Sequence, residues 1–280
     1  MNRYFSMLLV IPGLLFCGCQ AGTSGNSGDQ IKTLHKQEKF KIAGRKKKEP
    51  EKDSLISGFE SRLFNAWPQG IYDSVKVSAR FRKDSIRIAF QNAGTELQKE
   101  QIVNEAGKLL TDLIVYELIP FWYKTRWSFE GHTEVPRQGS VACGYFVSTV
   151  LRDAGFNLNR FKLAQGSPSA EAYSIGVLDS VKLLEGLPYS KVLEYFLTRN
   201  DGLYFVGLDY HVGFILKYSE RLYFIHSNYL DSKCVVVEPA KSSEAFFSYR
   251  IYIADITSNK NLIKSWILDS KIEIVDESDL

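Results

Sequence analysis

Residues 139–155 read GSVACGYFVSTVLRDAG, and the interpretation of the rest of the chain depends on this stretch. It begins with Gly and Ser, which favour a loop. Apolar residues then recur at helical spacing across residues 146–154, and Gly155 suits the left-handed conformation that often closes a helix. The pattern predicts a buried helix that carries Cys143 in its first turn.

The start of a helix is a favourable place for a reactive thiol. Its unpaired backbone N–H groups and the positive end of its dipole stabilise a thiolate relative to a thiol. The same N–H groups can receive the negative charge that develops on a carbonyl oxygen under attack. We therefore interpret Cys143 as a nucleophile, and we expect Gly144 to let a substrate approach the backbone closely. The alternative is a thiol buried in the core.

Two strand-like segments further along the chain each carry a histidine. His211 opens the run 211–216, and His226 lies in the run 222–228, after a short polar turn. In a hairpin with an even-numbered loop, paired residue numbers sum to an odd value, so both histidines project from the same face as direct or diagonal neighbours. This gives a general base in His211 and an orienting group in His226. Asn228, on the same face, is the alternative orienting group.

Three short motifs together resemble the NlpC/P60 superfamily of papain-like cysteine peptidases. They are ACGYFV at 142–147, HVG at 211–213 and FIH at 224–226, and the resemblance extends over residues 127–256. It implies an α+β papain-like fold, in which the helix bearing the nucleophile packs on an antiparallel sheet. Members typically cleave the peptide stems of bacterial cell walls with a cysteine, a histidine and a third polar residue. The resemblance carries these roles to Cys143, His211 and His226.

The same residues leave other functions open. Ala142 and Gly144 stand where the family usually has Asp and Ser. One alternative is a protein of the same fold that binds wall peptide or a partner protein without turnover. Another is an acyltransferase, since an amine instead of water can capture a thioester. His132, which lies near the nucleophile in sequence, is interpreted as structural or as a residue lining the cleft.

Cys143 has one candidate disulfide partner in the chain after processing, Cys234. A disulfide between Cys143 and Cys234 is the simplest structural alternative in an oxidising compartment. However, Cys234 lies in a β-branched run, where cysteine serves as a small buried hydrophobe. The histidines lack a helical His-x-x-x-His partner and the chain after processing has no Cys-x-x-Cys pair, so we expect no metal and no cofactor.

The first 19 residues are predicted to be a lipoprotein signal peptide. Arg3 precedes an apolar run at 7–16, which is too short to span a bilayer comfortably. The run ends in LFCGC, which resembles a bacterial lipobox with Cys19 as the lipidated residue. Cys17 is the alternative acceptor, and an ordinary cleaved signal is the alternative to lipidation. The resemblance implies a protein in the bacterial cell envelope, anchored in the membrane through its lipid.

The rest of the chain divides by composition into three parts. Residues 20–54 form a basic flexible tether, residues 55–124 a helical lobe, and residues 125–280 the papain-like domain. The 35 basic and 32 acidic residues give a formal charge of +3, which provides no overall field for nucleic acid, so we expect none as a partner. The sequence carries no signal for a particular oligomeric state.

Periodicity predicts the elements that flank the site. Helices are expected at 55–64, 71–81, 95–116 and within 180–198, with Thr95 as an N-cap and Pro120 marking the end of the third. Strands are expected at 85–90, 203–206, 211–218, 222–226, 234–237 and 249–256. The aromatic segment 121–129 is either part of the core or a surface on which a substrate stacks.

Overall fold

The computed structural model describes residues 50–64, 70–177 and 180–280, so the predicted signal peptide, Cys17, Cys19 and nearly all of the tether lie outside the described residues. The described chain is an α+β protein built on one antiparallel sheet of six strands, in the order β1-β6-β2-β3-β4-β5. The predicted α+β class and the antiparallel sheet are confirmed. No helix in the described ranges is both long and apolar enough to cross a membrane.

Five of the six strands lie where alternation and β-branched content predicted them. The strands are β1 (Val181–Glu185), β2 (Gly202–Leu208), β3 (Val212–Tyr218), β4 (Arg221–Ser227), β5 (Val235–Pro239) and β6 (Arg250–Asp255). Strands β3 and β4 form the predicted hairpin, in which Phe214 lies opposite Ile225. The paired numbers therefore have an odd sum, as the loop length required.

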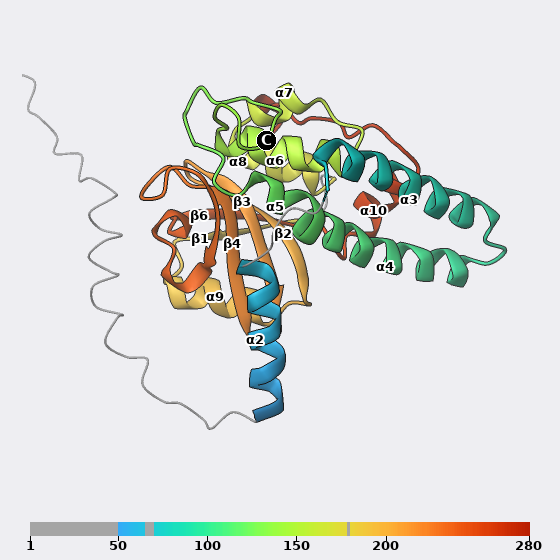
Figure 1. Cartoon of the computed structure of the whole chain (residues 1–280), viewed down its shortest axis with the longest axis horizontal. Coiled ribbons are helices and arrows are strands. Elements are labelled where there is room, and N and C mark those ends of the chain that lie inside the picture. Colours follow the sequence, from blue (N-terminus) through green and yellow to red (C-terminus); the bar gives the residue numbers. More distant parts are fainter. Residues whose placement is uncertain (1–49, 65–69, 178–179) are drawn as a thin grey trace, which may run out of the picture.

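Helices surround the sheet, and α3 and α4 form an antiparallel pair that extends away from it (Figure 1). The α-helices are α2 (Pro50–Phe64), α3 (Tyr72–Asn92), α4 (Glu96–Asp112), α5 (Ile119–Trp122), α6 (Cys143–Asp153), α7 (Arg160–Ala164), α8 (Pro168–Ile175), α9 (Tyr189–Leu197) and α10 (Lys260–Ile267). A π-helical turn, η1 (Leu113–Leu118), joins α4 to α5, and the 3₁₀ turns are η2 (Ala240–Ser242), η3 (Glu244–Phe246) and η4 (Glu277–Asp279).

Alternate residues of the strands contribute to two hydrophobic clusters, because successive side chains point to opposite faces of a sheet. Phe214 and Ile225 belong to the larger cluster, with Phe146 of α6 and Trp122 of α5. The smaller cluster contains Phe196 of α9 together with Tyr204, Ile215, Phe224 and Phe246. Helices of the predicted lobe at 55–124 share the larger cluster with the sheet, so this region packs on the same core as the nucleophile helix.

Three predicted elements differ from the structure. Residues 85–90, predicted as a strand, lie inside α3, where Ile86 and Phe90 pack against the core at the i, i+4 spacing of a helix. Within 180–198, predicted as helical, the chain first forms strand β1, which pairs with β6, and then α9. Thr95 caps α4 as expected, but Pro120 does not end the helical segment, because it occupies the first turn of α5, where no N–H donor is needed.

Candidate active site

Cys143 is the first residue of α6, as the sequence predicted. Ala142 is the N-cap residue and supplies no side-chain hydrogen bond to the helix. Phe146, one turn later, fixes the helix in the core, because its ring lies 6.2 Å from the rings of both Trp122 and Phe214. The backbone N–H groups of Cys143, Gly144 and Val212 face the sulfur and stabilise its negative form.

Burial nevertheless keeps the thiol protonated. Desolvation, and next the nearby charge of Glu171, raise the pKa of Cys143 to about 11, although the three N–H groups act in the opposite direction. The helix start does favour the thiolate through these N–H groups, as predicted, but desolvation outweighs them and the resting thiol is protonated. A base has to take the proton when the sulfur reacts.

The two predicted histidines form a direct hydrogen bond. Nε2 of His211 lies 2.8 Å from Nδ1 of His226, and their side chains are 3% and 0% exposed. The hairpin prediction that they are neighbours on one face is confirmed. Nε2 of His226 lies 3.1 Å from Oε1 of Glu238 on β5. The structure thus places His211, His226 and Glu238 in one continuous row.

Both imidazoles are neutral near neutral pH. Burial, with a smaller effect of charge on His226, lowers the pKa of His211 well below its ordinary value. Burial also lowers the pKa of His226, against the opposing effect of Glu238. Phe224 supports the pair: its ring stacks on His226 at 4.1 Å and meets His211 edge to face at 5.9 Å. A neutral imidazole is the form that can accept a proton.

Cys143 lies close to the backbone at the start of β3. The sulfur faces the N–H of Val212, the residue that follows His211. Ser227, next to His226, donates a hydrogen bond from Oγ to the carbonyl of Val141 at 2.7 Å and so holds the segment before the nucleophile. Among the described residues, which include Cys143 and His211, no hydrogen bond joins the Cys143 sulfur to the His211 ring.

Tyr229 is a further side chain at this meeting point. Its ring lies 5.0 Å from the His211 ring. Burial, and then the charge that develops on Cys143, raise the pKa of its hydroxyl. A protonated phenol beside both residues is a hydrogen-bond donor available to a substrate.

Packing against the neighbouring helices explains the glycine at position 144. A Cβ atom at this position would lie 2.7 Å from the carbonyl oxygen of Ala164 and 2.9 Å from Oε1 of Glu171. A side chain is therefore excluded here because α7 and α8 fill the space beside Gly144, and the close approach of a substrate stays a prediction. Glu171 is 3% exposed, its Oε2 has no hydrogen-bond partner within the described residues, and burial raises its pKa well above the ordinary range.

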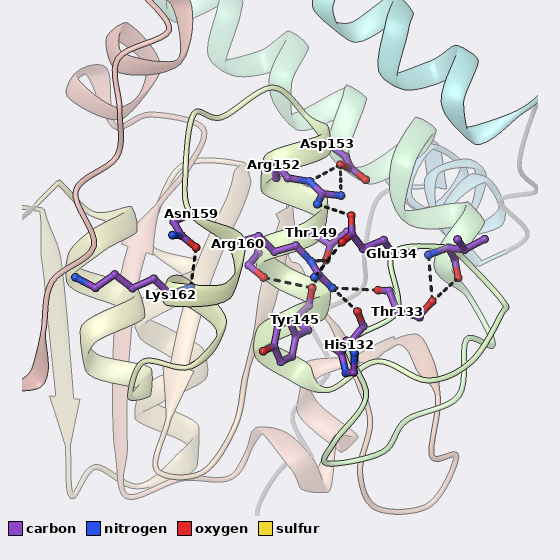
Figure 2. Close-up of polar contacts among 12 residues, drawn as sticks. His132, Thr133, Glu134, Tyr145, Thr149, Arg152, Asp153, Asn159, Arg160 and Lys162 are labelled. Carbon is purple, nitrogen blue, oxygen red and sulfur yellow. Dashed lines mark hydrogen bonds and ion pairs between the residues drawn. The ribbon is translucent and has the colours of Figure 1, made fainter.

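Arg160 fixes the other side of the segment that leads to the nucleophile, as Figure 2 shows. Its Nη2 donates to the backbone carbonyls of His132 and Thr133 at 2.7 and 3.1 Å, and its Nε donates to Oγ1 of Thr149 at 2.6 Å. Its guanidinium also lies over the Tyr145 ring, 4.9 Å from the centroid. The loop is thereby attached to α6.

His132 belongs to this cluster and not to the row of catalytic candidates. Its ring is exposed, lies 6.0 Å from the Tyr145 ring, and places Nδ1 2.9 Å from the carbonyl of Glu130. Its carbonyl is one of the two that Arg160 holds (Figure 2). Of the two interpretations of His132, the structural one fits these contacts.

Asn228 stabilises the turn after β4. Its Oδ1 accepts a hydrogen bond from the N–H of Leu230 at 2.7 Å, and its own N–H donates to the carbonyl of Cys234 at 2.9 Å. Of the two predicted orienting groups, His226 and Asn228, it is His226 that contacts the His211 ring. Cys143 and Cys234 are both free thiols, which excludes the disulfide alternative.

The aromatic segment 121–129 is buried near its beginning and exposed toward its end. Trp122 is fully buried in the core and donates a hydrogen bond to the hydroxyl of Tyr72. Trp127 is half-buried, with its ring 6.2 Å from that of Tyr229, and Phe129 is 81% exposed. The core interpretation therefore holds for the beginning of the segment, and substrate stacking at its exposed end stays a prediction.

Glu238, Glu171 and Tyr229 were not identified from the sequence. Glu238 lies in the β-branched run 234–239, where a single carboxylate beside valines was the available signal. Glu171 is an acidic residue in a short helix of otherwise small or apolar residues, a pattern that points to burial only once the helix is placed.

Comparison with protein-family models, with curated proteins and with solved structures gives no match to this chain. The described fold and site define an α+β protein with a cysteine at a helix start and a His–His–Glu row beside it. Its chemistry is therefore argued from these residues.

Proposed function

We propose that this protein is a cysteine hydrolase of papain-like fold in the bacterial cell envelope, which cleaves amide bonds, with peptidoglycan peptides as its substrates. The observation that supports this proposal is the arrangement of the three predicted residues. Cys143 begins a helix next to the N–H of Val212, and the adjoining His211 is hydrogen-bonded to His226. The substrate class comes from the resemblance of their motifs to the NlpC/P60 superfamily.

Acylation begins from a neutral thiol and a neutral imidazole. As the sulfur attacks the carbonyl carbon of the substrate, the thiol proton passes to Nδ1 of His211, which makes no hydrogen bond to any described residue. The carbonyl electrons move to oxygen and form a tetrahedral intermediate. When the C–N bond breaks, His211 returns the proton to the leaving nitrogen, and a thioester on Cys143 remains.

Deacylation repeats these roles with water. His211 removes a proton from water as its oxygen attacks the thioester carbon, and the C–S bond then breaks. The carboxylic acid leaves, and the thiol regains its proton from the imidazole. Acylation and deacylation both start from a neutral His211, which agrees with its lowered pKa.

Two donors are placed to stabilise the oxyanion. The backbone N–H of Cys143 is free of a side-chain cap at the start of α6. The second donor is the Tyr229 hydroxyl, whose pKa responds to charge on Cys143 and whose ring lies 5.0 Å from the His211 ring. Donors fixed before the reaction stabilise the negative charge at little reorganisation cost.

A binding module without turnover is the second candidate function. The pKa of Cys143 near 11 favours it, since a protonated, half-buried thiol without a hydrogen bond to the His211 ring is a weak nucleophile. The two candidates differ in whether His211 activates the sulfur when a substrate carbonyl is present.

Mass analysis of defined wall peptides tests the proposed reaction. We expect full-length protein to convert purified stem peptides into two fragments whose summed mass exceeds the substrate by one water. Cys143→Ser should yield no fragments, and Cys234→Ser is the matched control that should retain activity. A product joined to an added amine would identify an acyltransferase, and intact peptide with well-folded protein would support the binding module.

We further propose that Cys19 carries a lipid that anchors the protein to the membrane. This rests on the LFCGC motif after the apolar run 7–16. In bacterial cells, Cys19→Ser should move the protein from the membrane fraction to the soluble fraction, whereas Cys17→Ser should not. Unchanged partitioning of Cys19→Ser would contradict the anchor.

A further inference from the structure

We propose that Glu238 is a positioning residue that sets the tautomers of both histidines and thereby leaves Nδ1 of His211 able to accept the thiol proton. This inference rests on the proposed function and adds a fourth residue to the candidates Cys143, His211 and His226. It is carried by two hydrogen bonds in sequence, His211 Nε2 to His226 Nδ1 at 2.8 Å and His226 Nε2 to Glu238 Oε1 at 3.1 Å.

The Glu238 carboxylate is hydrogen-bonded to His226. Burial alone would raise the pKa of Glu238, but hydrogen bonding to its neighbours, His226 foremost, brings the pKa below its ordinary value, so the group is ionised at neutral pH. An ionised carboxylate only accepts hydrogen bonds. The Nε2 of His226 must therefore be the donor, and the proton of this neutral ring resides there.

The tautomer of His226 determines that of His211 through the hydrogen bond between the two rings. With its proton on Nε2, His226 presents an unprotonated Nδ1, which can only accept. His211 must then donate from Nε2 to that atom. A neutral His211 with its proton on Nε2 has a lone pair on Nδ1, the nitrogen that takes the proton from Cys143 in the proposed reaction.

Without the carboxylate the opposite arrangement becomes available. His226 can then carry its proton on Nδ1 and donate to Nε2 of His211, which places the His211 proton on Nδ1. In that tautomer His211 cannot act as a base toward the sulfur. Rings that are 3% and 0% exposed exchange protons with water slowly and have few other partners, so Glu238 decides between the two arrangements.

The position of Glu238 is set by the sheet. The register of β4 and β5 places Glu238 opposite Phe224 and Val236 opposite His226. The carboxylate therefore reaches His226 diagonally across the strand pair, on the face where Phe224 stacks on the His226 ring. Strand pairing thus positions the carboxylate, and a shift of one residue in β5 would turn its side chain to the other face.

The test is nitrogen-15 NMR of the histidine rings, in which two-bond proton–nitrogen correlations distinguish the two neutral tautomers. Wild-type protein should show the Nε2–H form for both His211 and His226. Glu238→Gln keeps the volume, but its amide can donate or accept, so the Nδ1–H form of His211 should appear. Glu238→Ala should show the same change, and it provides a second test should the first variant fold poorly.

Glu244→Gln is the matched control, an exposed residue at the start of η3, the second 3₁₀ turn after β5. Its histidine spectra should equal those of the wild type. Spectra of His211 and His226 that remain unchanged in both Glu238 variants would overturn the inference. The NMR result does not depend on turnover, so it is distinguishable from a failure of the proposed hydrolase, which would show as no peptide cleavage by wild-type protein. With turnover, Glu238→Gln should lower kcat by about 100-fold and leave KM nearly unchanged.

Discussion

Nε2 of His211 lies 2.8 Å from Nδ1 of His226, and both rings are almost completely removed from solvent. A buried hydrogen bond between two neutral imidazoles requires one ring to donate and the other to accept, so the protonation of each ring is determined by the other. The proposed catalytic competence of Cys143 therefore depends on residues that never touch the sulfur.

Removal of the orienting ring should impair both stability and turnover. His226→Ala leaves Nε2 of His211 without its buried partner, at a cost of about 1–3 kcal/mol in the free energy of unfolding, to which the vacated ring volume adds. We expect kcat to fall by roughly 10³-fold through loss of the productive tautomer. Urea unfolding and peptide cleavage measure the two effects. His132→Ala, at an exposed ring outside the row, should change neither quantity.

Glu171 should oppose ionisation of Cys143. Its charge contributes to the raised pKa of the thiol, second to burial, so Glu171→Gln should lower the pKa of Cys143. Thiolate absorbance during a pH titration, in a Cys234→Ser background, measures the shift. An unchanged titration curve would show that Glu171 does not act on the sulfur.

The same substitution should change how stability depends on pH. Burial raises the pKa of Glu171, so the folded protein retains a proton that the unfolded chain releases above its ordinary pKa of about 4.3. The stability associated with this residue is complete below that value and is lost as the pH rises toward the folded-state pKa. Glu171→Gln has no such loss, so its Tm relative to the wild type should increase as the pH rises above about 4. A constant difference would contradict the raised pKa.

Arg160 should stabilise the loop that leads to the nucleophile. Arg160→Ala leaves the carbonyls of His132 and Thr133 without their donor and removes the ring contact with Tyr145. We expect a loss of roughly 3 kcal/mol in the free energy of unfolding, measured by urea denaturation. Lys162→Ala, at an exposed cation on the same helix, should change stability by less than about 0.5 kcal/mol. Equal effects of the two variants would show that the Arg160 cluster is not stabilising.

Tyr229 should contribute to turnover and not to folding. If its hydroxyl stabilises the oxyanion, Tyr229→Phe should lower kcat by about 100-fold with little change in KM or Tm. Tyr210→Phe is the control, because Tyr210 adjoins His211 in sequence but is 92% exposed. Full activity of Tyr229→Phe would exclude the hydroxyl as an oxyanion donor.

The hairpin that carries the histidines was predictable because local rules determine it. A short polar turn and strict alternation define the register of β3 and β4, and this register makes His211 and His226 neighbours. The helix start at Cys143 was equally local, since glycine, serine and helical periodicity mark it within a few residues.

Long-range packing determined what could not be predicted. The six-residue run 85–90 alternates like a strand, and only its place within the 21-residue helix α3 resolves the ambiguity. Glu238 depends on the register between β4 and β5, whose connecting loop is longer than the short turn between β3 and β4 and does not by itself determine the register. The thiol pKa depends on how completely α7 and α8 enclose the helix start, which is a property of tertiary packing.

The most direct test of the central claim, that His211 activates Cys143, is the rate at which a neutral alkylating agent such as iodoacetamide modifies Cys143 at pH 7. The rate is measured in a Cys234→Ser background, with and without His211→Gln. Because the resting thiol is protonated, assistance by the base should dominate the rate, and His211→Gln should slow alkylation by about 100-fold, whereas His132→Gln should not. Equal rates with and without His211 would contradict the account.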